Sequence, residues 1–79
     1  MGPRKETLIR NLGALNLLGR GASCEDMMEV TKLTHSTQHM QTQDLIRKGY
    51  VEEKAMGGPG GLIHYFITQK GLDFLKVNA

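Results

Sequence analysis

The stretch that decides the fold is Met56–Thr68, MGGPGGLIHYFIT. Four glycines and a proline are followed at once by a dense apolar run. Glycine adopts positive φ easily and proline fixes φ, so together they allow the chain to reverse. Residues 50–56, YVEEKAM, and 62–68, LIHYFIT, flank the cluster, and both are rich in residues typical of strands. The sequence therefore predicts an antiparallel β-hairpin with this cluster as its turn.

The residues around the glycine cluster exclude two other interpretations of it. A phosphate-binding loop places Gly-Lys and then a helix after its glycines, whereas here a strand follows and no Gly-Lys pair exists. A flexible linker does not fit between two strands that flank it so closely. In the second strand, Ile63, Tyr65 and Ile67 alternate onto one face, which we predict to be the core face. Leu62, His64 and Phe66 share the other face, where we expect the last helix or a second subunit to cover Phe66.

Three helices are predicted before the hairpin. The first runs from about Pro3 to Leu18, with Leu8, Leu12 and Leu15 at helical spacing. Its other side, formed by Gly13, Ala14 and Leu17, is also apolar, which indicates burial on two sides or a partner helix. A capping-box pattern, SCED at 23–26, starts a short second helix that ends near Thr31.

The third predicted helix spans residues 34–48. Thr34 is its expected N-cap and Gly49 its C′ residue. The short connection between the second and third helices makes a helix-turn-helix. A last helix, QKGLDFLK at 69–76, follows the hairpin with Thr68 as its cap, and we expect Leu72 and Leu75 to point inward beside Phe74.

Length, charge and cysteine content limit the possible classes of protein. The 79 residues suffice for one small domain, 1–79, and the formal charge is +2. The sequence contains neither an apolar run of 18 residues nor a signal-peptide pattern, so we expect a cytoplasmic protein with no membrane contact. One cysteine, Cys24, cannot form an internal disulfide and is expected to be a partly buried apolar filler.

This order of elements resembles the winged helix-turn-helix family of small transcriptional regulators of bacteria, archaea and their viruses. The residues that carry the resemblance are LTHSTQHMQTQDLIRKGYVEE (33–53) and IHYFITQKGLDFL (63–75), and it covers roughly residues 7–76. It implies an α+β winged helix: a three-helix core with a helix-turn-helix, a two-stranded β-hairpin wing at about 50–68 and a short C-terminal helix. It also implies that the third helix enters the major groove of double-stranded DNA.

The helical wheel of residues 34–48 sorts the side chains that such an interface would use. Leu45 must be buried, and Gln38, Thr42 and Gly49 share its side. The opposite side has chemistry that suits base edges, while cations near the helix end and on the wing suit phosphates. The predicted DNA-binding residues are Ser36, Thr37, His39, Met40, Gln43, Arg47, Lys48 and Lys54.

Several residues depart from that pattern. Gln38 and Thr42 occupy usually apolar positions, which indicates a rotated helix or loose packing. Asp44 would repel phosphate if it faced DNA, and the tip of the wing has no Arg or Lys. Met40 is an apolar side chain on a face expected to be exposed.

Catalytic and metal-binding interpretations find little support in the residues. His35 and His39 share a helical face, but a metal site needs further ligands, and Cys24 is the only obvious soft candidate. A Cys24–His35 nucleophile pair lacks an orienting acid, and so small a domain has little room for a substrate pocket. We therefore expect no enzyme activity, catalytic residues, cofactor, metal or small-molecule substrate.

Two functional hypotheses remain. The first is a sequence-specific regulator of transcription that binds double-stranded DNA as a homodimer and acts by occupying promoters, with the Gly13, Ala14 and Leu17 side of the first helix as the candidate interface. The second is a winged-helix module for protein–protein interaction, which the low net charge, the uncharged wing tip, Met40 and Asp44 favour.

Overall fold

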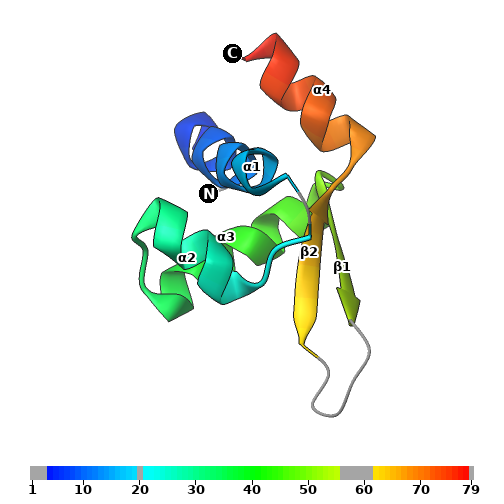
Figure 1. Cartoon of the computed structure of the whole chain (residues 1–79). Coiled ribbons are helices and arrows are strands. Elements are labelled where there is room, and N and C mark those ends of the chain that lie inside the picture. The colour runs from blue at the N-terminus through cyan, green and yellow to red at the C-terminus, as the bar shows by residue number, and fades with distance from the viewer. Residues whose placement is uncertain (1–3, 20, 56–61, 79) are drawn as a thin grey trace.

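The computed structural model describes residues 4–19, 21–55 and 62–78 and confirms the predicted α+β order of elements. The helices and strands are α1 (Lys5–Leu18), α2 (Cys24–Thr31), α3 (His35–Arg47), β1 (Val51–Ala55), β2 (Ile63–Ile67) and α4 (Gln69–Val77). Figure 1 shows α2 and α3 below α1, the hairpin beside them, and α4 near the base of the hairpin. The predicted glycine turn, 56–61, and Pro3 lie outside the described residues.

Side-chain caps start three of the helices where the sequence predicted them. Ser23 Oγ accepts a hydrogen bond from the Asp26 N–H, and the Asp26 carboxylate accepts one from the Ser23 N–H, both at 3.2 Å. Thr34 and Thr68 each accept from the backbone N–H three residues further on. These caps satisfy N–H groups that have no partner inside a helix, and so fix where α2, α3 and α4 begin.

Left-handed residues end the first three helices. Gly19, at φ 69°, closes α1, and Gly49, at φ 80°, follows α3 as predicted. Lys32 closes α2 at φ 62°, a conformation that is uncommon for a residue with a Cβ atom. The connection at residues 32–34 then turns the chain directly into α3, which completes the predicted helix-turn-helix.

The core lies where α1, α2, α3 and the hairpin meet. The predicted stripe on α1 is confirmed, and α2, α3, β1 and β2 each add one side chain. The buried cluster consists of Leu8, Leu12, Leu15, Ala22, Met27, Leu45, Val51 and Tyr65. Phe74 and Leu75 of α4 pack against its edge, with the Phe74 ring 4.8 Å from that of Tyr50.

A third chain segment pairs with the hairpin, which the sequence analysis did not predict. β1 and β2 are antiparallel, from the Val51–Ile67 pair to the Ala55–Ile63 pair. On the other edge of β2, the Ala22 N–H donates to the Tyr65 carbonyl at 3.0 Å, and the Tyr65 N–H donates to the Ala22 carbonyl at 2.8 Å. The segment before α2 therefore ties the hairpin to the helices.

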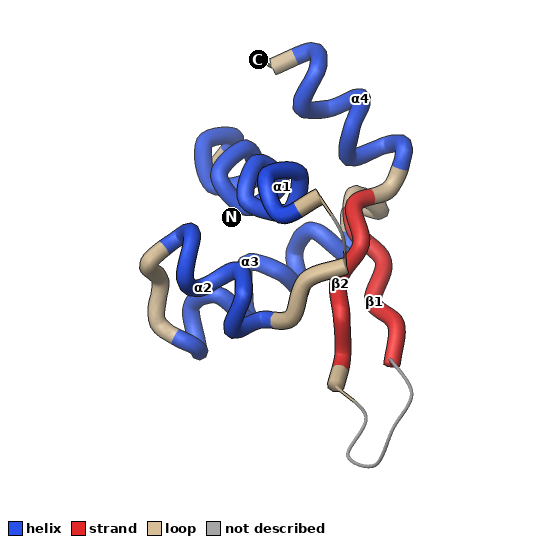
Figure 2. Tube along the Cα trace, in the orientation of Figure 1, coloured by secondary structure: helices blue, strands red, loops and turns tan. Residues whose placement is uncertain are grey.

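Two predictions about the hairpin need correction. Ile63 was expected in the core but is 47% exposed. Ile63 is the first residue of β2. Figure 2 shows this end of the hairpin at the edge of the helical body. Phe66 was expected to be covered by the last helix or a second subunit, whereas its ring lies directly against Gly21 of the segment that pairs with β2.

The predicted faces of α4 and α1 are found only in part. Leu72 is 38% exposed and lines a hollow with Leu15 and Ile67, while α4 packs on the body through Gly71, Phe74 and Leu75. On the second apolar side of α1, Ala14 is buried within the chain, in line with the predicted burial on two sides, whereas Leu17 is exposed. None of the helices within the described ranges is long and apolar enough to cross a membrane.

Gly71 allows α4 to approach the body, and its substitution tests that contact. In an open helix, Gly→Ala stabilises by about 1 kcal/mol. At Gly71, however, a methyl group would meet the Tyr50 carbonyl oxygen and lie 2.8 Å from Ile67 Cγ1. We expect Gly71→Ala to lower the free energy of unfolding by about 1–3 kcal/mol, measured in urea.

Gly13 provides the matched control for this prediction. It lies in α1, and an added methyl group would have nothing within 4 Å. Gly13→Ala should therefore raise stability by up to about 1 kcal/mol. Equal effects from the two substitutions would show that α4 leaves room for a methyl group at Gly71.

Candidate nucleic-acid interface

The outer face of α3 carries most of the predicted DNA-binding residues, and it is open to solvent. Five of them are exposed and two are half-buried, while Leu45 on the opposite side is fully buried. The exposed five are Ser36, His39, Met40, Arg47 and Lys48, and the half-buried two are Thr37 and Gln43. α3 therefore presents hydroxyl, amide, imidazole and cationic groups on one surface, together with a 58% exposed methionine.

The buried side of α3 is largely polar. Gln38 and Thr42 are fully buried, as their position on the helical wheel predicted. Their packing is ordered by hydrogen bonds, so the expected loose packing was wrong. Gln38 Nε2 donates to Asn11 Oδ1 of α1 at 2.7 Å and to Thr42 Oγ1 at 3.0 Å, and the Thr31 hydroxyl donates to Gln38 Oε1 at 2.6 Å. Sequence reasoning missed Asn11, which lies among the leucines of α1.

Asp44 lies at the flank of the outer face and forms an ion pair with Arg47 one turn later. The Arg47 side chain is 70% exposed, so solvent screens the pair and its contribution to stability is small. The pair nevertheless competes with the phosphate contact that was predicted for Arg47. It also gives Asp44 a partner, which moderates the repulsion expected from its carboxylate.

Removing the charge of Asp44 tests this balance. We expect Asp44→Asn to raise affinity for any duplex DNA, because Arg47 is released and an anion near the phosphates is removed. The increase should be about three- to tenfold at low salt, similar for unrelated sequences, as measured by fluorescence anisotropy. Arg47→Ala should change affinity in the opposite direction, and an unchanged affinity in Asp44→Asn would place this flank away from DNA.

The described part of the wing offers one cation. Lys54 on β1 is exposed, and its Nζ lies 5.3 Å from the centre of the Phe66 ring on the same face of the hairpin. This cation–π contact holds the ammonium group beside the sheet without neutralising it. His64, the strand neighbour of Lys54, lies 3.4 Å through Nδ1 from the Gly21 carbonyl oxygen and is thus turned toward the body.

Cys24 and the histidines do not form a reactive site. Burial raises the pKa of the Cys24 thiol, and the nearby charge of Glu25 raises it further, so the thiol stays protonated and is a poor nucleophile or metal ligand. The rings of His35 and His39 are stacked with centroids 6.5 Å apart. Within the described residues, no three His, Cys, Asp or Glu side chains gather as a metal site would require.

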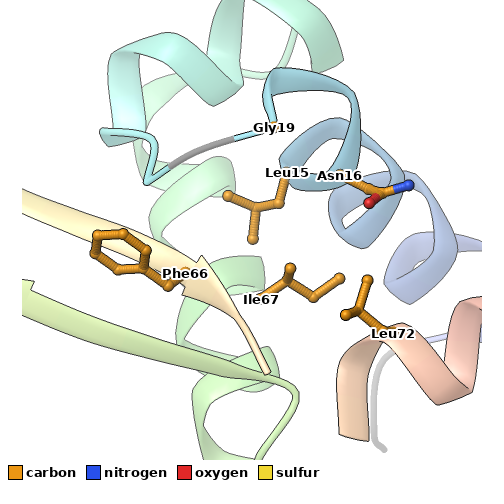
Figure 3. A pocket seen from close by; sticks show the side chains of 6 residues that line it. All are labelled: Leu15, Asn16, Gly19, Phe66, Ile67 and Leu72. Atoms are coloured by element: carbon orange, nitrogen blue, oxygen red, sulfur yellow. The ribbon is translucent and has the colours of Figure 1, made fainter. Parts of the chain in front are cut away.

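A separate hollow of about 270 Å³ lies between α1, β2 and α4. Figure 3 shows its lining, in which the side chains of Leu15, Ile67 and Leu72 approach one another from the three elements. The lining is mostly apolar and includes no residue of α3. The hollow is therefore separate from the outer face that carries the predicted DNA contacts.

A helix-turn-helix packed on a third helix, with a hairpin wing and a closing helix, defines the winged-helix class. Solved structures of two transcription regulators share this fold. A PadR family transcription regulator from Clostridium difficile R20291 has a TM-score of 0.80 and 16% identity, over 91% of this chain and 81% of that one. MepR, a transcription regulator of the Staphylococcus aureus multidrug efflux pump MepA, has a TM-score of 0.76 and 17% identity.

The second match covers 90% of this chain but only 52% of MepR, so this chain spans about half the length of that regulator. At these identities the likeness shows the winged-helix fold, which the sequence resemblance predicted. No protein-family model matches the sequence, and no curated protein matches it.

Proposed function

We propose that this protein is a regulator of transcription that binds double-stranded DNA in a sequence-specific manner. The observation that supports this most directly is the orientation of α3, whose polar face is open while Leu45 anchors the opposite side. An α-helix fits the major groove of DNA. The two solved structures that share the fold of this chain are transcription regulators.

The outer side chains divide into two roles under this proposal. Gln43 offers an amide that can pair with adenine, Ser36 can donate or accept a hydrogen bond, and Met40 can touch a thymine methyl group. Thr37 and His39 flank these base-reading groups. Arg47 and Lys48 at the end of α3, and Lys54 on the wing, hold backbone phosphates instead.

The proposed mechanism is occupancy of a promoter, which blocks or recruits polymerase. It requires no catalytic residue, cofactor or small-molecule substrate. We therefore propose that the protein is not an enzyme. We also propose that it acts in the cytoplasm, which is where a prokaryotic cell holds its DNA.

We further propose that the protein acts as a homodimer on two half-sites about one helical turn apart. Exposed apolar side chains on α1 and α4 support this, because Leu17 is 74% and Val77 82% exposed, and Leu72 lies on the same helix as Val77. Light scattering on the purified protein tests the dimer, and a Leu17→Glu, Val77→Glu variant should be monomeric.

Substitution of Gln43 tests the base-reading role. We expect Gln43→Ala to relax preference at one base pair of each half-site, at a cost of about 1–3 kcal/mol for the preferred sequence. Affinity for unrelated DNA should stay the same, because a base contact adds little to nonspecific binding. Competition assays with single-base variants of a selected site measure this, and unchanged preference at every position would remove Gln43 from the interface.

Selection from a random duplex library tests the proposed function as a whole. A recovered palindrome would give the target, the symmetry and the half-site spacing together. Failure to enrich any sequence, combined with no binding at low salt, would instead favour the second candidate function. That candidate is a protein–protein interaction module. The exposed Met40 and the Asp44–Arg47 pair favour it.

A further inference from the structure

The buried hydrogen-bond network under α3 includes side chains from all three helices of the core. Asn11 of α1 donates through Nδ2 to the Thr7 carbonyl at 2.9 Å and to Gln41 Oε1 at 2.7 Å, and it accepts from Gln38. Thr42 donates to the Gln38 carbonyl at 2.8 Å. Thr31 supplies the contact from α2.

The two buried amides of this network, Asn11 and Gln38, are fully paired in their present orientation. Both N–H bonds of Asn11 Nδ2 and both of Gln38 Nε2 have an acceptor, and each amide oxygen has a donor. Reversing the Gln38 amide alone would bring its oxygen against Asn11 Oδ1, with no hydrogen between the two acceptors. Among the described residues no buried side-chain N or O atom lacks a partner.

Such a network restrains rotation of α3 more strongly than apolar packing does. Only three side chains of α3 are buried, and two of them, Gln38 and Thr42, are polar. Apolar contacts are non-directional, so Leu45 and the partly buried Ile46 hold α3 against the core but restrain small rotations of the helix less. Separating buried amides from their partners costs the full desolvation penalty of each group. A single buried Asn fixes the register of coiled coils for the same reason.

We propose that Asn11 and Gln38 are positioning residues for sequence reading, which rests on the proposed function. Side chains extend about 5–6 Å from a helix axis, so a rotation of about 20° moves them by about 2 Å. A direct hydrogen bond to a base does not survive such a shift. The network thus sets sequence discrimination without touching DNA, while nonspecific phosphate binding depends on it much less.

An apolar replacement of the network tests the inference. The variant combines Asn11→Leu, Gln38→Met and Thr42→Val, which conserve shape and leave few buried polar groups unpaired. We measure the ratio of Kd for a selected duplex to Kd for a scrambled one. The preference for the selected duplex should fall at least about tenfold, the loss typical of one good base contact. The Kd for the scrambled duplex and the melting temperature should be close to those of the parent.

A core variant outside the network separates positioning from stability. Met27 is fully buried in the core cluster and makes none of these hydrogen bonds. Met27→Ala should lower the melting temperature yet keep the parent's preference when binding is measured well below it. A folded triple variant that discriminates as well as the parent would overturn the inference.

A milder variant tests the positioning role of the network if the triple variant does not fold. Thr31 is only half-buried at the edge of the network, and Thr31→Val removes one hydrogen bond to Gln38. Its preference should fall about threefold, and an unchanged preference would contradict the inference. The parent protein reports on the proposed function separately, because failure of the parent to bind any duplex would overturn that function first.

Discussion

The affinity of this protein for duplex DNA should fall about a thousandfold when monovalent salt rises from about 50 to about 200 mM. In the proposed homodimer each protomer would offer Arg47, Lys48 and Lys54 to phosphates, so that about six phosphate charges would be neutralised. The expected slope of log affinity against log salt is then about −5. The counterions released on binding, and not any single contact, produce this effect.

Fluorescence anisotropy with labelled duplex at several salt concentrations measures the slope. Lys48→Gln should make it less steep by about two in a dimer, because one phosphate contact is lost in each protomer. Gln43→Ala should lower affinity for the preferred site without changing the slope. A slope near zero would contradict phosphate binding and favour the protein–protein module.

Leu45→Ala should lower the free energy of unfolding by about 2–5 kcal/mol, which is a large part of the stability of a domain this small. Leu45 is the only fully buried apolar side chain of α3 and packs in the central cluster. The chain holds Leu45 further through its carbonyl, which accepts from the Tyr50 N–H at 3.0 Å at the start of the wing. Loss of the side chain leaves a cavity beneath both elements.

Met40 gives the matched control on the same helix. It is 58% exposed on the outer face, so Met40→Ala should change stability by no more than about 0.5 kcal/mol. Urea unfolding followed by circular dichroism measures both variants. Similar stability losses for the two would mean that α3 does not turn Leu45 inward and Met40 outward.

The local signals in the sequence predicted the ends of the helices well. The caps at Ser23, Thr34 and Thr68 and the left-handed Gly49 depend on neighbours within a few residues, so a single sequence carries the information. The hairpin was also predicted from local signals, which are the glycine cluster and the two strand-like segments that flank it. The orientation of α3 followed from Leu45, whose burial required the polar face to lie outside.

Contacts between distant segments were not predicted. The pairing of Ala22 with Tyr65 involves only one residue of each segment, so it leaves no periodic pattern in the sequence. The alternation along β2 correctly grouped its faces but could not show that the helical body ends before Ile63. Leu72 was expected inside with Leu75 but is 38% exposed, because α4 makes its close approach to the body at Gly71.

The polar core illustrates the same limit for the candidate site. Gln38 and Thr42 were noticed as departures from an apolar pattern, and this signal was correct. Their partner Asn11 gave no signal, since a lone Asn in an amphipathic helix is ordinarily solvent-exposed. The roles of the outer-face residues remain predictions, since only their accessibility follows from the fold.

The backbone pair between Ala22 and Tyr65 has a consequence for how the domain comes apart. It encloses α2, α3 and β1 in a loop whose two ends are joined by paired amides. Separation of β2 from the segment before α2 requires the release of both hydrogen bonds, so this contact opposes fraying of the hairpin from the helices. We therefore expect the wing and the helices to open together when the domain is heated, with amide exchange at Ala22 and Tyr65 as slow as in the core helices.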